Sequence, residues 1–146
     1  MTQTSLTAVY LRRGKEESLE RCHPWIFSGA IERITEGLKP LSEGDIVDVY
    51  TKQGNFIARG HYQIGSIAVR VLSFEEESID QAWWNRRIAA AKALRESLGM
   101  VDNAQTSCYR LIHGEGDLLP GLVVDIYERT AVVQCHSVGM YHSRSQ

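Results

Sequence analysis

The chain has 146 residues, of which 43% are hydrophobic and 23% are charged, proportions typical of a folded soluble protein and not of a disordered, collagen-like or disulfide-scaffold chain. The length predicts one domain or two small ones. Sixteen Lys and Arg against eighteen Asp and Glu give a net charge of −2, which argues against a uniformly basic, nucleic-acid-binding surface. Twelve of the sixteen cations are arginine, the residue that suits bidentate contacts with phosphate. A local basic surface is therefore compatible with this composition.

The three cysteines, Cys22, Cys108 and Cys135, are an odd number without Cys-x-x-Cys spacing. They predict neither a disulfide framework nor a zinc ribbon, and they favour a reducing compartment. The N-terminus lacks the pattern of a secretory signal, and no segment approaches the roughly 18 apolar residues that span a bilayer. The histidines and cysteines also lack the spacing of a metal site. We expect a cytoplasmic protein with no membrane segment and no bound metal.

The first half of the chain has the pattern of a small β structure. Residues 6–12 read as a strand and residues 16–21 as a short helical turn. Tight turns separate three further strand-like segments, which are residues 45–50, 55–62 and 66–73. Short strands at this spacing predict a compact β-barrel of about 70 residues, and we place this domain at residues 1–74.

A change of composition follows at residues 75–80, which contain four acidic side chains and predict a linker. Ser78 with Gln81 has the spacing of a capping box and predicts a helix that runs to about Leu98 and ends at Gly99. Apolar residues recur along it at helical spacing, namely Trp84, Ile88, Ala91, Leu94 and Leu98. This helix must pack against another element.

Three more strands, at residues 108–113, 122–128 and 131–137, predict an antiparallel β-meander beside the helix. The expected fold class is therefore α+β, with residues 81–146 forming a partial second subdomain. The chain stops soon after what reads as the start of another helix, which predicts either an artificially shortened chain or one that naturally lacks a domain its relatives carry.

A glycine-containing segment at residues 114–121 lacks the Gly-Lys-Ser/Thr ending of a phosphate loop, and a strand follows it instead of a helix. It is predicted to be a structural turn. Its acidic residues Glu115 and Asp117, and Asp125 in the next strand, are expected to be solvated.

Cations and rings gather in the first domain. Strand alternation places Arg59 and His61 on one side of their strand, and Arg70 in the next strand can join them. Such groups bind phosphates and unstacked bases. The candidate RNA-binding residues are Arg12, Arg13, Arg21, His23, Arg59, His61 and Arg70. The alternative is that they are solvated or ion-paired, because residues 1–74 carry a net charge of only +1.

Several segments resemble a known family. RCHPWIFSGAI (residues 21–31), GDIVDVY (44–50) and IAVRVLS (67–73) are similar to the N-terminal PUA domain of the large-subunit (23S) ribosomal RNA methyltransferase I family. WWNRR (83–87), YRLIHGEGD (109–117), LPGLVVD (119–125) and SVGMYHSR (137–144) resemble the central subdomain of that family and the helix that follows it. Trp25 lies in the first of these segments and is expected to be a core residue by the usual burial of Trp, the alternative being a stacking platform.

The resemblance implies a PUA-like RNA-binding domain from an S-adenosylmethionine-dependent 5-methylcytosine methyltransferase. The family's Rossmann-like domain, which binds the cofactor and carries the catalytic cysteine, is not matched by any segment here, so no cysteine is assigned as nucleophile and no cofactor is expected in this chain. Leu118 stands where the family often has glycine, which puts the geometry of that turn in question.

The sequence therefore predicts a region that binds and targets 23S ribosomal RNA and is inactive as an enzyme by itself. The alternative is a protein-protein module that does not bind RNA. In that case the apolar stripe of the helix and the exposed hairpin mediate a homodimer or docking to a missing methyltransferase domain.

Overall fold

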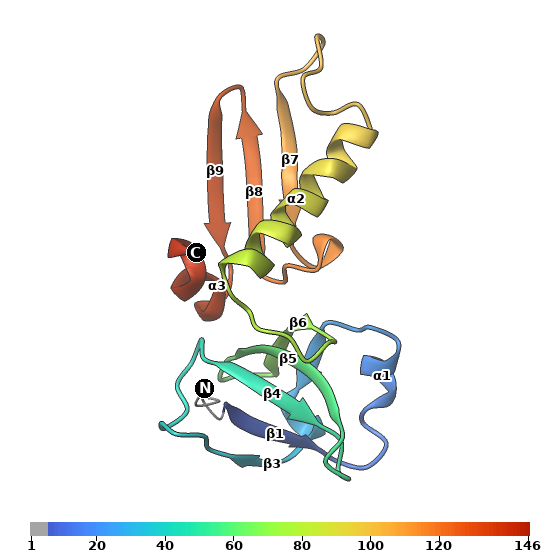
Figure 1. The fold of residues 1–146 in the computed structure, drawn as a ribbon, viewed down its shortest axis with the longest axis vertical. Coiled ribbons are helices and arrows are strands. Elements are labelled where there is room, and N and C mark those ends of the chain that lie inside the picture. The colour runs from blue at the N-terminus through green and yellow to red at the C-terminus, as the bar shows by residue number, and fades with distance from the viewer. Residues whose placement is uncertain (1–5) are drawn as a thin grey trace. The chain divides into compact units, whose positions relative to one another are not determined.

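The computed structural model describes residues 6–146, so residues 1–5 of the predicted first domain lie outside the described residues. The chain divides into two compact units, Met1–Glu77 and Ser78–Gln146, shown in Figure 1. The division falls inside the predicted acidic linker.

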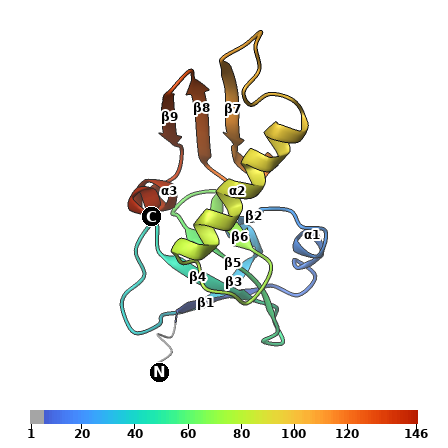
Figure 2. The same ribbon diagram turned by 45° about the horizontal axis from the view of Figure 1, so that its top comes forward.

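The first unit is a curled sheet of six strands in the order β2-β6-β5-β4-β1-β3. Its pairs are antiparallel except β1 with β4, which is parallel. The strands are β1 Thr7–Leu11, β2 Trp25–Phe27, β3 Ile31–Thr35, β4 Ile46–Tyr50, β5 Phe56–Tyr62 and β6 Ile67–Ser73. The helix α1 (Glu17–Glu20) and the 3-10 turn η1 (Ser28–Ala30) connect the first three strands, and α1 lies beside β2 in Figure 2.

The core of this unit follows from strand alternation. Every second residue points to the inside of the curl, and the buried set includes Val9, Leu11, Ile26, Val47, Val49, Ala58, Val69 and Val71. Gly60 sits beside a register shift between β5 and β6, where a side chain would collide with the backbone of Arg70. The backbones approach closely there, which helps the sheet to curl. The predicted small β-barrel in an α+β fold is confirmed.

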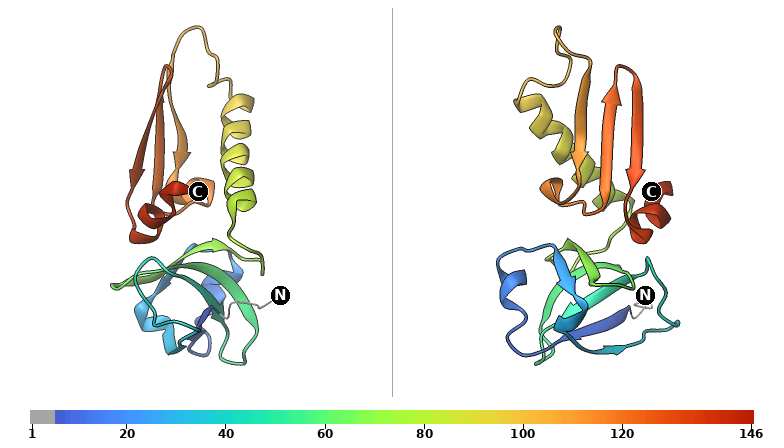
Figure 3. Two further views of the ribbon diagram at one scale, coloured as in Figure 1. Left: turned by 60° about the vertical axis from the view of Figure 1, so that its left-hand side comes forward. Right: turned by 180° about the vertical axis from the view of Figure 1, so that it is seen from behind.

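The second unit contains a helix and a three-stranded antiparallel sheet in the order β7-β8-β9. Its elements are α2 Gln81–Ser97, β7 Cys108–His113, the 3-10 turn η2 Gly114–Asp117, β8 Leu122–Tyr127, β9 Thr130–Cys135, α3 Val138–His142 and the 3-10 turn η3 Ser143–Ser145. Figure 3 shows α2 along one face of the sheet and the opposite face without a covering element from this unit. The predicted meander is confirmed.

Two details of α2 differ from the sequence prediction. The N-cap is Asp80 and not Ser78, because the Asp80 Oδ1 atom accepts a hydrogen bond from the Trp83 backbone N–H at 2.9 Å. The predicted apolar stripe is also wrong at three of its five positions, since Ile88, Leu94 and Leu98 are 37%, 48% and 64% exposed while Arg95 is buried. The helix turns Arg95 inward because a buried partner holds its guanidinium.

That partner is Asp117 in η2, whose side chain is only 4% exposed. The guanidinium of Arg95 binds both carboxylate oxygens, with Nη2 at 2.8 Å from Oδ2, and its Nε donates to the Arg110 carbonyl at 3.0 Å. The His113 backbone N–H also donates to Asp117 at 2.6 Å. The expectation that Asp117 is solvated is therefore wrong, and the pair joins α2 to β7 and to the turn after it.

Asp125 is also paired, with the Nε and Nη2 atoms of Arg110 at 2.8 and 3.0 Å from its two oxygens. The expectation that Asp125 is solvated is wrong as well. Its side chain is mostly buried, whereas that of Arg110 is about half exposed. Arg110 spans β7 and β8 in register with Asp125, so this pair reinforces the sheet.

Acid is expected to destabilise the second unit through these two carboxylates. Burial alone would raise the pKa of Asp117, but hydrogen bonds from Arg95 and from the His113 backbone lower it below its ordinary value of 3.8. The hydrogen bond from Arg110 lowers the pKa of Asp125. A lowered pKa means that the stabilisation is complete above the ordinary value and is lost as the pH falls below it. Urea midpoints measured from pH 6 to pH 2.5 should therefore drop below about pH 4, and an Asp117→Ala variant should show a shallower drop.

Leu118 occupies a strained position after η2. Its backbone lies in the left-handed region, with φ 58° and ψ 31°, where a side chain costs about 1 kcal/mol that glycine avoids. Leu118→Gly is therefore expected to be more stable than Leu118→Ala by roughly 1 kcal/mol in urea unfolding. The alanine variant is the matched control because both changes remove the same exposed side chain. Equal stability of the two variants would contradict a strained turn.

Candidate nucleic-acid interface

Three aromatic rings form a row along β2 and the residue pair before it. Ile26 points into the core, so its neighbours Trp25 and Phe27 point the other way, and Phe27 is 50% exposed. The His23 and Trp25 rings meet edge to face at 5.8 Å, and the Trp25 and Phe27 rings at 6.4 Å. We call His23, Trp25 and Phe27 the aromatic strip. It offers ring surface at a sheet edge, the arrangement on which unstacked bases bind.

The strip is fixed by backbone contacts. The Trp25 backbone N–H donates to the Nδ1 atom of His23 at 3.2 Å, which orients the exposed imidazole. In the β2–β6 register, Trp25 lies opposite Arg70. Trp25 is half-buried, so it lies only partly in the core where the sequence placed it, and part of its ring stays open for stacking.

Exposed cations border the strip. Arg12 follows β1 and is anchored, because its backbone N–H donates to the Ala30 carbonyl at 2.8 Å and its Nε donates to the Ile31 carbonyl at 3.2 Å. Arg13 and Lys15 are exposed in the turn that leads to α1, and Arg21 is exposed at the end of α1. We define the β2-edge surface as these cations together with the strip, namely Arg12, Arg13, Lys15, Arg21, His23, Trp25 and Phe27.

A cavity of about 360 Å³ lies inside the β2-edge surface, between α1 and β2. Lys15 and Ser18 contribute polar groups to its lining, and Trp25 and Phe27 contribute ring surface. This volume falls within the roughly 300–1,000 Å³ of small-ligand pockets. A flat, polar-edged group such as a nucleobase suits such a lining. The exposed Glu17 and Glu20 on α1 lower the net charge nearby, so phosphate attraction here is moderate.

The structure separates the seven predicted residues into groups. Arg12, Arg13, Arg21 and His23 are exposed in the β2-edge surface. Arg70 is half-buried next to Trp25, and its Nη1 donates to the Gln63 Oε1 atom at 3.1 Å. His61 lies opposite Arg70 in the β5–β6 register but is buried. Contact of any of the seven with RNA stays a prediction.

Arg59 is engaged in an ion pair within its own sheet. It lies opposite Asp48 in the β4–β5 register, with Nε and Nη2 at 2.6 and 3.0 Å from the two carboxylate oxygens. Its Nη1 donates to the Glu77 carbonyl. The hydrogen bond to Asp48 raises the pKa of Arg59, and the side chain is 13% exposed. A phosphate would have to displace Asp48 to reach it.

Lys15, Trp25 and Phe27 are part of the surface but are absent from the predicted RNA-binding residues. The segment Trp25-Ile26-Phe27 does alternate between ring and aliphatic side chain, and that alternation indicates a strand with its rings on one face. The neighbouring Pro24 and Gly29 conceal this signal by suggesting irregular structure.

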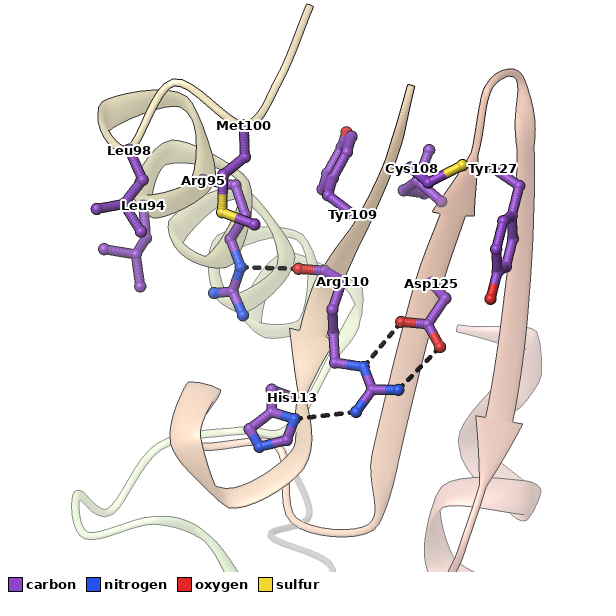
Figure 4. Close-up of a pocket in the computed structure, with 11 residues that line it drawn as sticks. Leu94, Arg95, Leu98, Met100, Cys108, Tyr109, Arg110, His113, Asp125 and Tyr127 are labelled. Carbon is purple, nitrogen blue, oxygen red and sulfur yellow. Dashed lines mark hydrogen bonds and ion pairs between the residues drawn. The ribbon is translucent and has the colours of Figure 1, made fainter. Parts of the chain in front are cut away.

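The second unit has an open groove of about 680 Å³ beside α2 and β7, drawn in Figure 4. Arg110 lies at its centre, with dashed lines to Asp125 and to the Nδ1 atom of His113, 3.3 Å away. Leu94, Leu98 and Met100 supply apolar surface at one side. Arg110 and Asp125 pair with each other, and Arg95 pairs with Asp117, so this groove is a weaker candidate for ligand binding than the β2-edge surface.

Residues 114–121 do not fit a cofactor loop for S-adenosylmethionine. β7 continues through η2 into the antiparallel strand β8, so no helix N-terminus faces an anion there. The Asp117 carboxylate is already bound to Arg95. Residues 6–146 contain no group of three or more His, Cys, Asp or Glu placed to hold a metal ion. Within the same residues, no helix is both long and apolar enough to cross a membrane.

Comparison with known proteins gives both a domain family and full-length relatives. Residues 9–74 match the family model of a PUA-like domain. The chain is 44% identical over 135 residues to the Ribosomal RNA large subunit methyltransferase I of Photobacterium profundum, covering 91% of this chain and 33% of that protein. The Escherichia coli protein of the same name is 42% identical over 137 residues, and the match covers 92% of this chain and 33% of that protein. The chain thus spans about a third of the length of the curated relatives it matches.

Solved structures share the fold. A candidate SAM-dependent methyltransferase from Streptococcus mutans matches with a TM-score of 0.77 at 17% identity, covering 94% of this chain and 35% of that one. A second candidate methyltransferase, crystallised with SAH, gives the same TM-score, and the match covers 94% of this chain and 34% of that one. The chain is therefore a homologue, along about nine-tenths of its length, of the ribosomal RNA large subunit methyltransferase I proteins, with a PUA-like domain at residues 9–74.

Proposed function

We propose that this chain binds ribosomal RNA, specifically 23S RNA in the cytoplasm, and does so through the β2-edge surface. The observation that carries the proposal is the aromatic strip bordered by exposed cations at the edge of a PUA-like sheet. The names of the relatives support it, because those proteins are ribosomal RNA methyltransferases.

Different residues of the β2-edge surface bind different parts of the RNA. Arg12, Arg13 and Arg21 contact phosphates, which positions the RNA without reading its sequence. Unstacked bases lie against Trp25 and Phe27, and one base enters the cavity lined by Lys15. A duplex hides its base faces, so the surface favours single-stranded or looped RNA over a continuous duplex.

We assign no methyl-transfer step to the described residues. S-adenosylmethionine would supply the methyl group in the full-length relatives, and the contribution of this chain is to hold the RNA substrate. On this proposal, the chain alone does not methylate RNA.

Titration of the chain into a fluorescently labelled 12-nucleotide RNA tests the proposal. With three to four phosphate contacts, raising salt from 50 to 200 mM should weaken binding about 20- to 50-fold. A duplex of the same sequence should bind more weakly than the single strand. Absence of binding at 50 mM salt, or affinity that does not change with salt, would contradict the proposal.

The competing interpretation is a docking or dimerisation module that does not bind RNA. The exposed apolar side chains Tyr127, Val132 and Val133 of the β8–β9 hairpin favour a protein contact there. This interpretation predicts no RNA binding at any salt concentration, whereas a protein contact in addition to RNA binding is compatible with the proposed function.

A further inference from the structure

A second groove of the first unit lies where the end of β3 and the loop after it meet the turn that follows β5. Its volume of about 780 Å³ falls within the roughly 300–1,000 Å³ of ligand-binding pockets. It combines four apolar or aromatic side chains with two carboxylates. We call it the loop groove and define it by Ile34, Glu36, Leu41, Glu43, Tyr62 and Ile64. It shares no residue with the β2-edge surface.

Aliphatic side chains of the loop groove are open to solvent. Ile64 in the turn after β5 is 71% exposed, and Ile34 at the end of β3 is 38% exposed. Leu38, in the same loop as Glu36 and Leu41, is 77% exposed. Exposed apolar side chains that are bordered by polar groups mark surfaces that bind a partner.

Backbone contacts hold the two carboxylates of the groove in place. The Oε1 atom of Glu36 accepts a hydrogen bond from the Leu41 backbone N–H at 3.2 Å, and the Oε1 atom of Glu43 accepts one from the Ile64 backbone N–H at 2.9 Å. The second contact ties the β3–β4 loop to the β5–β6 turn. Each carboxylate uses one oxygen in this way, so its other oxygen can accept from a ligand.

The charge of the groove is not neutralised by its surroundings. The neighbouring acids Glu32 and Asp45 are paired with Lys52 and Lys39 at 2.9 and 2.6 Å, and the guanidinium of Arg33 lies over the Tyr10 ring.

Among residues 6–146, no cation forms an ion pair with Glu36 or Glu43, and no Lys, Arg or His lines the groove. Two negative charges repel the phosphates of RNA and attract a cationic partner.

We propose that the loop groove docks a basic peptide segment of a partner protein, in which aliphatic residues are flanked by Lys or Arg. The aliphatic side chains cover Ile34 and Ile64, and the flanking cations pair with Glu36 and Glu43. The contact is small and its charges lie at a solvated rim, so we expect a dissociation constant on the order of 100 µM. This docking goes beyond the RNA-binding proposal and does not rest on it.

Fluorescence anisotropy with two labelled synthetic peptides tests the proposal at 50 mM salt. The first peptide is Ser-Lys-Arg-Leu-Val-Arg-Lys-Ser, and the second has serine in place of its Leu and Val and keeps the same charge. The full chain, titrated to about 1 mM, should bind the first peptide. It should bind the second at least about fivefold more weakly, because the second lacks the apolar side chains that cover the groove.

The double variant Glu36→Gln with Glu43→Gln tests the role of the two charges. Glutamine keeps a side-chain oxygen that accepts the same backbone hydrogen bond, so the loop is expected to stay in place. Binding of the first peptide should weaken about five- to tenfold. The matched control, Glu17→Gln with Glu20→Gln, removes the same charge from α1 and should change the affinity less than twofold. Circular dichroism and thermal unfolding verify that each variant folds.

Three results would overturn the proposal. The first is no binding of the aliphatic peptide at 1 mM chain. The second is equal binding of the two peptides, which would show attraction by charge alone. The third is a glutamine variant of the groove that binds the peptide as well as the wild type or the α1 control does, which would place the contact on another surface. None of these results bears on RNA binding, because the loop groove contains no residue of the β2-edge surface.

Discussion

Asp117→Ala is expected to lower the free energy of unfolding of the second unit by about 3–5 kcal/mol. The change leaves the guanidinium of Arg95 buried without its carboxylate, and it also removes the acceptor for the His113 backbone N–H. Loss of one partner costs far more than the pair itself contributes, because an uncompensated buried charge has lost its hydration. The unit is small, so a loss of this size is a large share of its stability.

Urea unfolding followed by tryptophan fluorescence measures this effect, since Trp83 and Trp84 are buried in the second unit. Asp125→Ala is the control, because its partner Arg110 stays in contact with water when the carboxylate is removed. The control should lose much less stability. Similar losses in the two variants would show that burial of the Arg95–Asp117 pair does not have the importance assigned to it.

Replacing both Trp25 and Phe27 by alanine should weaken RNA binding at least about 30-fold, since each base stacked on an aromatic ring contributes roughly 1–3 kcal/mol. Phe27→Ala alone should weaken binding about fivefold or more. It is the safer variant for folding because Phe27 is half exposed. Fluorescence anisotropy at 50 mM salt gives the affinities.

Two control variants accompany this prediction. Phe27→Tyr keeps a ring at the strip and should bind RNA nearly as well as the wild type. Ile64→Ala removes an exposed apolar side chain between β5 and β6 and should leave the affinity unchanged. If Phe27→Ala and Ile64→Ala bind like the wild type, bases do not stack on the strip.

Strong local patterns explain which parts of the fold are predictable. The strands β4, β5 and β6 are mostly buried runs of five to seven residues rich in β-branched and aromatic side chains, and turn residues separate them, so the runs are visible in the sequence. β7 and most of β8 alternate between more exposed and more buried residues, and β9 is recognised by its β-branched residues and the short turn before it. The three-residue strand β2 is too short to show a period, and Pro24 beside it suggests irregular backbone.

Side-chain partners that are distant in sequence explain the errors. Arg95 sits among apolar residues of α2, and only its contact with Asp117, 22 positions later, turns it inward. Arg59 likewise reads as a free cation until the β4–β5 register brings Asp48 opposite to it. Asp80 and Ser78 are both good N-cap residues, and the local pattern could not distinguish them.

The candidate site, too, could be predicted only where its residues are close together in the sequence. Arg12, Arg13, Arg21 and His23 belong to one continuous segment, so their proximity follows from the chain. The cavity between α1 and β2 depends on how the strand edge meets the helix, and this packing has no sequence signature. Phe27 could have been found from the alternation around Ile26, whereas Lys15 becomes a candidate only through the cavity it lines.

An NMR titration of the ¹⁵N-labelled chain with single-stranded RNA tests the central claim most directly, because it locates the bound surface residue by residue. The account predicts that the largest amide shifts fall in residues 12–15 and 21–27, together with the indole N–H of Trp25. Shifts concentrated in β7, β8 and β9, or no shifts at saturating RNA, would contradict it.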